Sequence, residues 1–417
     1  MQAAFWSLLL PAVAAAQPVV DSVEGTMSED AHLLIRGSGF GDRPDAPIAW
    51  DEFEAGSLGD APGSGWTTWT TLPEGAPRVD NGQLRRGSAR SLYCDFSGSN
   101  DESAIGIAED LDEVWVSFWA QVRHVGTFSR SYARLRMVGA SPSARPTWTH
   151  LFLGGDGGDG RWLAGATDDG CTLEAAAYGG EGEDFLEEQR WMRHDYWLRQ
   201  SAANEADGLM AVFRDLAAER FTAFSVAAGG VVEVGRAVAT RCGDDGWAAL
   251  RIGALWAHDP GGDGGVWLDD VYVDRTPARV EIGNAPLWDQ ATLAEVQPSV
   301  SWGGEGIEIE VNEGTLFAGS TYWLYVFDAQ NLPSQGFPIQ LGASYGPGGD
   351  AGPDPRATPG PRGGCGCRSA VPVPEPGAAC ALFLLAAICR HEKANRQRRS
   401  LGSPACVELP RGVQGRR

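Results

Sequence analysis

The chain is built from short segments in which apolar and polar residues alternate, separated by glycine-rich and acidic turns. Residues 114–122, 131–137 and 267–274 are clear examples. An alternation with period two is typical of strands that bury one face. Helical periodicity is confined to residues 181–192, where a short helix and an irregular loop fit equally well. The pattern therefore predicts an all-β fold.

Two parts of the chain far apart in sequence look like halves of one small β-domain. The first, residues 18–48, holds two short apolar segments and then R-G-S-G-F-G at residues 36–41, where glycines permit a tight turn and Phe40 can be buried. It is too short to fold alone. The second, residues 277–343, supplies the missing strands. We expect one split domain, with two independent β-units as the alternative.

The region between these halves, residues 49–276, is long enough for one large β-sandwich. Residues 344–370 are rich in proline and glycine and read as a linker that cannot bury a core. We therefore expect a large sandwich inserted in a smaller one, followed by a flexible connection.

The N-terminus predicts export. Residues 5–16 form an apolar run that ends in Ala14-Ala15-Ala16-Gln17, the small-residue pattern that signal peptidases cleave. A basic segment before the run is missing, but a buried strand or helix would need cap or turn residues that are also missing. We expect residues 1–17 to be a signal peptide.

Charge and lysine content restrict the chemistry. The formal net charge is −22, which excludes nucleic acid as an expected partner. An acidic surface either keeps the exported protein soluble or binds divalent cations. The only lysine is Lys393, so a lysine base or Schiff base is excluded from the body of the protein.

Of the eight cysteines, Cys94, Cys171 and Cys242 lie in the body of the chain and the others near its C-terminal end. Cys171 and Cys242 each adjoin an acidic glycine turn, which makes them the preferred disulfide pair. Sequence alone leaves the connectivity open.

The C-terminal part combines V-P-E-P at residues 373–376, an apolar run at 377–389 and a cluster of arginines. The run is too short to span a bilayer as a helix, and a buried or aggregation-prone tail is the alternative. Residues 371–399 resemble PEP-CTERM sorting tails, and G-G-C-G-C at 363–367 is similar to the cysteine element of MYXO-CTERM tails. Both resemblances imply export, membrane attachment through the tail, and processing. We expect residues 400–417, which continue beyond these patterns, to be a disordered basic extension.

The split domain resembles IPT/TIG domains, which are immunoglobulin-like modules of cell-surface proteins. The resemblance rests on R-G-S-G-F-G, on V-E-I-G at residues 280–283, on Trp302 and on the closing segment 322–328. It implies an immunoglobulin-like β-sandwich.

The inserted region resembles concanavalin-A-like lectin and glucanase sandwiches, including their polysaccharide-lyase-like branch. The residues concerned are R-W-M-R-H-D-Y-W at 190–197, N-E-A-D-G-L-M-A-V at 204–212 and V-W-L-D-D-V-Y-V-D at 266–274. The resemblance implies a jelly-roll fold, which hosts lectins, enzymes and inert modules alike.

Four residues are candidates for glycan binding. Tyr132, Arg134 and Arg136 share one face of a predicted strand, where an aromatic ring can stack on a sugar and guanidinium groups can bind carboxylates. Trp197 is the further candidate. The alternative for the strand is a solvated sheet face.

Catalysis by a lyase requires a base such as histidine or tyrosine beside an arginine that neutralises a carboxylate. His150, His194 and Tyr196 are the catalytic candidates, and nothing in the sequence brings them together. The paired carboxylates of a retaining glucanase are missing. We therefore expect a protein that is not an enzyme, and a polysaccharide lyase if it is one.

No cofactor is required by this interpretation. Asp156, Asp159 and Asp263 lie on or beside glycine-rich turns and offer oxygen ligands to one structural calcium.

The sequence thus predicts a cell-surface or secreted carbohydrate-binding protein whose partner is an extracellular polysaccharide or cell-envelope glycan. Its localisation is the cell surface or outer envelope, with attachment to the membrane through the tail or release after processing. A polysaccharide-active enzyme for acidic substrates is the first alternative. A purely structural surface module is the second.

Overall fold

The computed structural model describes residues 17–70, 76–95, 102–125, 134–139, 148–152, 163–167, 177–179, 189–202, 205, 207–218, 221–223, 230–232, 234–238, 247–255 and 263–346. Within these residues the regular structure consists of strands in four antiparallel sheets and one 3-10 turn, η2 (Trp288–Gln290). The prediction of an all-β fold is confirmed. Met192 opens a strand, and residues 181–188 of the ambiguous segment lie outside the described residues.

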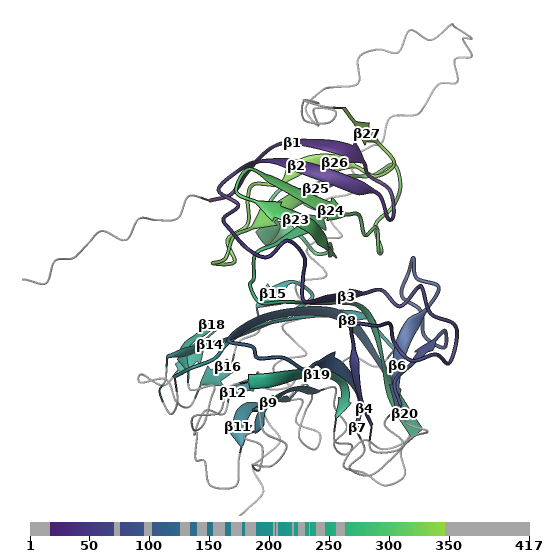
Figure 1. Cartoon of the computed structure of the whole chain (residues 1–417), viewed down its shortest axis with the longest axis vertical. Helices are drawn as coiled ribbons and strands as arrows, with labels where there is room; N and C mark the ends of the chain where they lie inside the picture. Colours follow the sequence, from purple (N-terminus) through teal and green to yellow (C-terminus); the bar gives the residue numbers. More distant parts are fainter. Residues whose placement is uncertain are drawn as a thin grey trace, which may run out of the picture. The chain divides into compact units, whose positions relative to one another are not determined.

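Two sheets form what we call the small sandwich. The five-stranded sheet has the order β23 (Ser299–Gly303), β24 (Gly306–Glu310), β2 (His32–Ser38), β1 (Val19–Thr26), β27 (Ser344–Tyr345). The four-stranded sheet has the order β22 (Ala294–Gln297), β21 (Arg279–Gly283), β25 (Thr321–Phe327), β26 (Phe337–Gln340). In Figure 1 the purple strands β1 and β2 lie beside the green strands β23 and β24, so one sheet joins residues from both ends of the described chain.

Alternation turns one face of each of these two sheets toward a shared core. Leu33 and Ile35 of β2 and Ile307 and Ile309 of β24 are fully buried, and they pack in one core with the inward residues of the four-stranded sheet, such as Val280. Removal of this apolar surface from water stabilises the small sandwich.

The R-G-S-G-F-G segment closes that core. Phe40 is 1% exposed, as expected of a buried plug. Gly39 and Gly41 have φ of +74° and +72°, a region that favours glycine. Gly37 is required for a different reason than the turn expected from sequence, because a Cβ there would lie 1.9 Å from the carbonyl oxygen of Val19.

The other two sheets form the large sandwich. The first, here called the β8 sheet, has the order β15 (Ala217–Ala218), β14 (Gly208–Arg214), β13 (Met192–Arg199), β8 (Glu113–Val125), β20 (Asp263–Asp274), β6 (Ser91–Asp95), β5 (Arg78–Asp80), with β18 (Val234–Val238) paired to β14 and β3 (Ala49–Asp51) paired to β20. The second, here called the β9 sheet, has the order β17 (Gly230–Val232), β16 (Phe221–Ala223), β12 (Ala177–Gly179), β11 (Leu163–Thr167), β10 (Trp148–Phe152), β9 (Arg134–Gly139), β19 (Trp247–Leu255), β7 (Glu102–Ile107), β4 (Thr67–Thr70).

The β8 sheet is buried on both faces. Phe118, His194 and Tyr196 have no exposed surface, and the ring of Phe118 stacks on those of His194 and Tyr196. Trp115 and Trp197 are an odd number of residues from Phe118 and Tyr196 on the same strands, so they belong to the opposite face, where they pack with Val296 of the small sandwich. This sheet therefore lies between the core of the large sandwich and the small sandwich.

A buried cluster of charges joins the two sandwiches at Arg193. Its guanidinium donates to both oxygens of Glu281 on β21, at 2.7 and 2.9 Å, and to Asp195 Oδ1. Arg279 also donates to Glu281, and its guanidinium carbon lies 3.8 Å from the ring centroid of Trp115. Burial alone would raise the pKa of Glu281, but Arg193 and Arg279 hold it below its usual value.

A second cluster is centred on Arg85, which is 3% exposed. It donates to both oxygens of Glu295 on β22, each at 2.9 Å, and to Asp269 and Asp270 on β20. Asn312 donates to Asp270 at 3.0 Å. Asp269 and Asp270, the two adjacent aspartates of V-W-L-D-D-V-Y-V-D, thus bind the side chains that connect the two sandwiches.

Arg43 makes a third connection where the chain enters the large sandwich. It forms an ion pair of 2.5 Å with Asp274, at the end of β20, and donates to Ser299 Oγ at 3.2 Å. Its guanidinium also stacks over Trp302. The chain passes from one sandwich to the other twice, just before β3 and just after β20. Arg43 lies in the first of these connections and contacts the end of β20, where the second begins.

We expect Arg193→Ala to lower the free energy of unfolding by about 3–5 kcal/mol, because it leaves Glu281 and Asp195 as buried carboxylates with one cation fewer. Denaturant unfolding of the purified protein measures this. The matched control is Arg190→Ala, which removes an ion pair with Asp215 from a side chain that is 48% exposed and should change stability by less than about 1 kcal/mol. Equal effects of the two substitutions would contradict the prediction.

Candidate functional site

Strand register brings several of the predicted site residues together on the β9 sheet. His150 on β10 is paired with Arg136 on β9, and Arg136 is paired with Arg251 on β19. The row continues to Gly165 beyond His150 and to Gly106 beyond Arg251. Residues directly opposite each other on antiparallel strands belong to the same face of a sheet. We call this set the basic row.

The basic row belongs to the face of the β9 sheet that is turned away from the sandwich core. Leu250 and Ile252 are buried, whereas Arg251 between them is partly exposed. Leu250 is paired with Met137, and Ile252 with Ile105. Strand alternation then assigns position 251 to the outer face, and register pairs position 136 with it.

Register also places aromatic positions beside the basic row. Arg134 is paired with Phe152, and Trp148 is paired with Val138. Each of these positions is two residues from Arg136 or His150 along the same strand, so it belongs to the same face. Basic and aromatic residues are the combination that binds anionic sugars.

Three other predicted residues lie elsewhere. Trp197 is on the β8 sheet, 4% exposed, and its Nε1 donates to Glu113 Oε1 at 2.6 Å. The expectation that it shares a site with Arg134 is not met, because its face of the sheet is covered by the small sandwich. His194 and Tyr196 are fully buried on the other face of β13, so neither can contact a polymer in this structure.

The remaining predicted site residues cannot be placed. Asp263 opens β20, but its side chain lies outside the described residues. The others that lie outside are Tyr132, Asp156, Asp159, Cys171 and Cys242. The calcium site and the disulfide therefore stay predictions. Cys94 is buried on β6.

Arg251 was missed by the sequence-based reasoning. Its signal was present as L-R-I at residues 250–252, a basic residue between two apolar ones, as in the segment that holds Arg134 and Arg136. Sequence could not reveal that β19 and β9 are neighbours, because 107 residues lie between the two strands and long-range pairing is not encoded locally.

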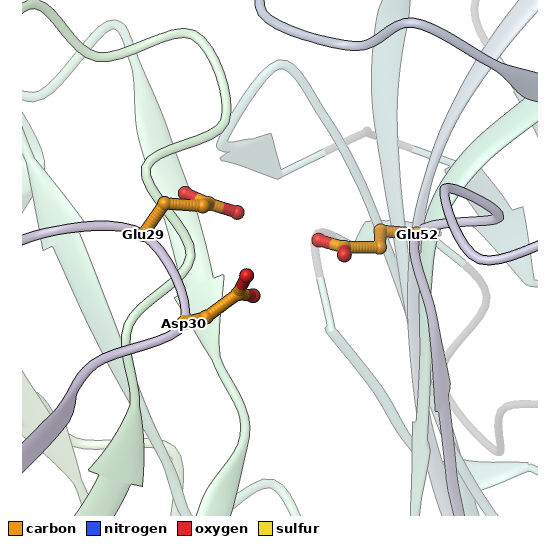
Figure 2. Close-up of side chains that lie close together, drawn as sticks. All are labelled: Glu29, Asp30 and Glu52. Carbon is orange, nitrogen blue, oxygen red and sulfur yellow. The ribbon is translucent and has the colours of Figure 1, made fainter.

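A second group of interest is a cluster of three carboxylates. Figure 2 shows Glu29 and Asp30, from the turn between β1 and β2, facing Glu52, which follows β3. Their oxygens lie within 4.8 Å of one another. Carboxylates at this spacing are ligands of the kind that calcium accepts. Exposed acidic groups are also common without an ion, so the cluster alone identifies no metal site.

Two carboxylates of this cluster, Glu29 and Glu52, have raised pKa values. Burial, together with the charges of Asp30, Glu313 and Asp270, raises the pKa of Glu29 to about 7, against a hydrogen bond from the backbone of Glu313. Burial and the charges of Glu29 and Asp270 raise the pKa of Glu52 to about 8. The cluster is therefore partly protonated at neutral pH.

Comparison of the sequence with protein families and with curated proteins finds no match to either. Among solved structures, the chain is similar to a marine alginate lyase from Aplysia kurodai, with 11% identity, coverage of 52% of this chain and 97% of the other, and a TM-score of 0.35. The cellulose induced protein Cip1 has 16% identity, coverage of 55% and 97%, and a TM-score of 0.33. The carbohydrate recognition domain of Emp47p has 10% identity, coverage of 56% and 99%, and a TM-score of 0.25. TM-scores below 0.5 assign neither a family nor a ligand.

A search of the described residues for membrane-spanning helices finds none that is long and apolar enough. The C-terminal tail for which membrane attachment is expected lies outside the described residues.

The raised pKa values predict that stability falls as pH rises. In the unfolded chain both glutamates titrate near their usual pKa of 4.5, whereas the folded chain keeps these protons until pH 7 or 8. The folded state therefore binds more protons between pH 4.5 and 8, and its stabilisation is lost across that window. Glu52→Gln should flatten the pH dependence and stabilise the protein at pH 9 by on the order of 1 kcal/mol after allowance for solvent screening.

Thermal unfolding measured from pH 5 to pH 9 tests this prediction. Glu305→Gln, which removes an exposed carboxylate elsewhere on the small sandwich, is the control and should leave the slope of the wild-type curve unchanged. A Glu52→Gln curve parallel to that of the wild type would show that the cluster does not act as described.

Proposed function

We propose that this protein is an exported carbohydrate-binding protein that holds an extracellular polysaccharide on the β9 sheet of its large sandwich. The observation that carries the proposal is the basic row, in which register pairs Arg136 with His150 and with Arg251. Guanidinium groups bind carboxylates in bidentate fashion, and the aromatic positions Trp148 and Phe152 flank the row. The ligand class is therefore an acidic glycan.

The proposal includes the cell surface as the site of action. The signal-like residues 1–17 and the tail at 371–399 support it by their sequence patterns. Binding through side chains of this kind needs no cofactor.

Binding should be lost when the row is disrupted. A charge-assisted hydrogen bond contributes about 1.5–3 kcal/mol, so Arg136→Ala should weaken binding of an acidic polymer by about tenfold to a hundredfold. The measurement is binding of the full chain to polygalacturonate, alginate, hyaluronate and dextran sulfate, with neutral dextran for comparison. Binding should also weaken with added salt.

Arg275→Ala is the matched control, because Arg275 is 48% exposed and pairs with Glu109 away from the row. It should bind as the wild type does. If no polymer binds to the wild-type protein, the proposal fails and a purely structural surface module becomes the better description.

A second candidate function is polysaccharide lyase activity. The specific observation in its favour is the pairing of His150 with Arg136, which puts a possible base next to a group that can neutralise a carboxylate. In such a reaction the imidazole takes the proton from the carbon beside the carboxylate. The electrons of that C–H bond form a carbon–carbon double bond, the glycosidic C–O bond breaks, and the departing oxygen takes a proton from water.

Lyase activity would produce unsaturated chain ends that absorb in the ultraviolet. The wild-type protein should generate them from one of the acidic polymers named above. His150→Ala should abolish the product, whereas binding should only weaken, because Arg136 and Arg251 remain. Binding without any such product would favour the carbohydrate-binding protein over the enzyme.

A further inference from the structure

Gln17 is the first residue that the structure describes, and it follows the predicted cleavage site directly. The small residues Ala14-Ala15-Ala16 predict that a signal peptidase hydrolyses the bond between Ala16 and Gln17. Hydrolysis leaves a free α-amine on Gln17. In a glutamine with a free amine, the carboxamide carbon Cδ lies within reach of the amine nitrogen through a five-membered ring.

The structure leaves Gln17 accessible on the surface of the small sandwich. The residue is exposed, and its Nε2 donates to the carbonyl oxygen of Pro333. Pro18 is buried, and β1 begins at Val19. The amine of a chain that starts at Gln17 therefore lies two residues before the first strand, and a reaction there disturbs no ladder hydrogen bond.

Pro18 decides which reaction the carboxamide of Gln17 can undergo. In other sequences the backbone nitrogen of the following residue can attack Cδ, which leads to a cyclic imide and then to deamidation. The nitrogen of proline carries no hydrogen and cannot react in this way. Attack by the α-amine of Gln17 itself is the intramolecular reaction that stays open.

We propose that Gln17 is a modification site, which cyclises to pyroglutamate after residues 1–16 are removed, so that the exported protein begins with an uncharged lactam. The α-nitrogen forms a bond to Cδ, the bond between Cδ and Nε2 breaks, and Nε2 leaves as ammonia with the proton that the amine gives up. The step needs no oxidant, reductant or cofactor. The inference rests on export, which is one part of the proposed function, and does not depend on carbohydrate binding.

Cyclisation changes the start of the small sandwich in two ways. It removes the positive charge of the terminal amine. It also removes the Nε2 donor to Pro333, while the ring keeps one N–H that can take its place. Because β1 is paired with β2 and is part of the sheet that closes the core, a blocked terminus protects this strand from exopeptidases that need a free amine.

The N-terminal tryptic peptide tests the proposal. The full chain, with residues 1–16 in place, is produced in a bacterium that exports it. Arg36 is the first arginine or lysine of the chain, so trypsin releases residues 17–36 from the processed protein and residues 1–36 from the unprocessed one. Mass spectrometry should find residues 17–36 lighter by about 17 Da, the mass of one ammonia, than the peptide with an open glutamine. The intact protein, measured before digestion, should show the same loss.

Two variants serve as controls. Gln17→Asn keeps a carboxamide, but attack by its amine would close a strained four-membered ring, so the peptide of residues 17–36 should keep its ammonia. Ala16→Leu places a large side chain where signal peptidases require a small one. Gln17 should then stay inside a longer peptide and should not cyclise, because its nitrogen is part of a peptide bond.

A peptide of residues 17–36 with an open glutamine, or a ring that appears only after digestion, would overturn the inference and leave export standing. A processed protein that begins at any residue other than Gln17, such as one that has lost Gln17 and Pro18 together, would do the same. Residues 1–36 as the only N-terminal peptide would overturn both the inference and export. The binding of acidic polymers is measured separately, so its failure is distinguishable from all of these outcomes.

Discussion

The buried arginine–carboxylate clusters at the joint between the sandwiches are the interaction on which the rest of this structure depends. Arg193 and Arg85 each reach from the large sandwich to a glutamate of the small one, Glu281 and Glu295. Charges taken out of water are stable only when their partners are in place, so these contacts require one relative arrangement of the β8 sheet and the four-stranded sheet. The large sandwich is thus fixed on the small one, in addition to being connected to it by the chain.

This joint also decides which surfaces can serve recognition. The outer face of β8 and β13 carries Trp115 and Trp197, two aromatic residues that would suit a sugar platform, but Val296 of the small sandwich packs against them. The residues on the other face of the same strands are in the core. The basic row belongs to the other sheet of the large sandwich, which is why the proposed function is placed there.

The two kinds of charged site differ in what surrounds them. At the joint, arginines compensate the carboxylates, and the pKa of Glu281 is held low. At the cluster of Glu29, Asp30 and Glu52, carboxylates face carboxylates, and the pKa values of Glu29 and Glu52 rise. The same acidic composition therefore stabilises the protein in one place and makes its stability depend on pH in another.

By itself the sequence determined the all-β class, the alternation that buries Leu33 and Ile35, and the burial of Phe40, because period-two patterning and turn glycines act over a few residues. It also placed Arg134 and Arg136 on one strand face. Only the tertiary structure decided that His150 and Arg251 join them while His194, Tyr196 and Trp197 do not. Strand neighbours are chosen by packing and register between segments far apart in the chain, and local sequence holds no record of that choice.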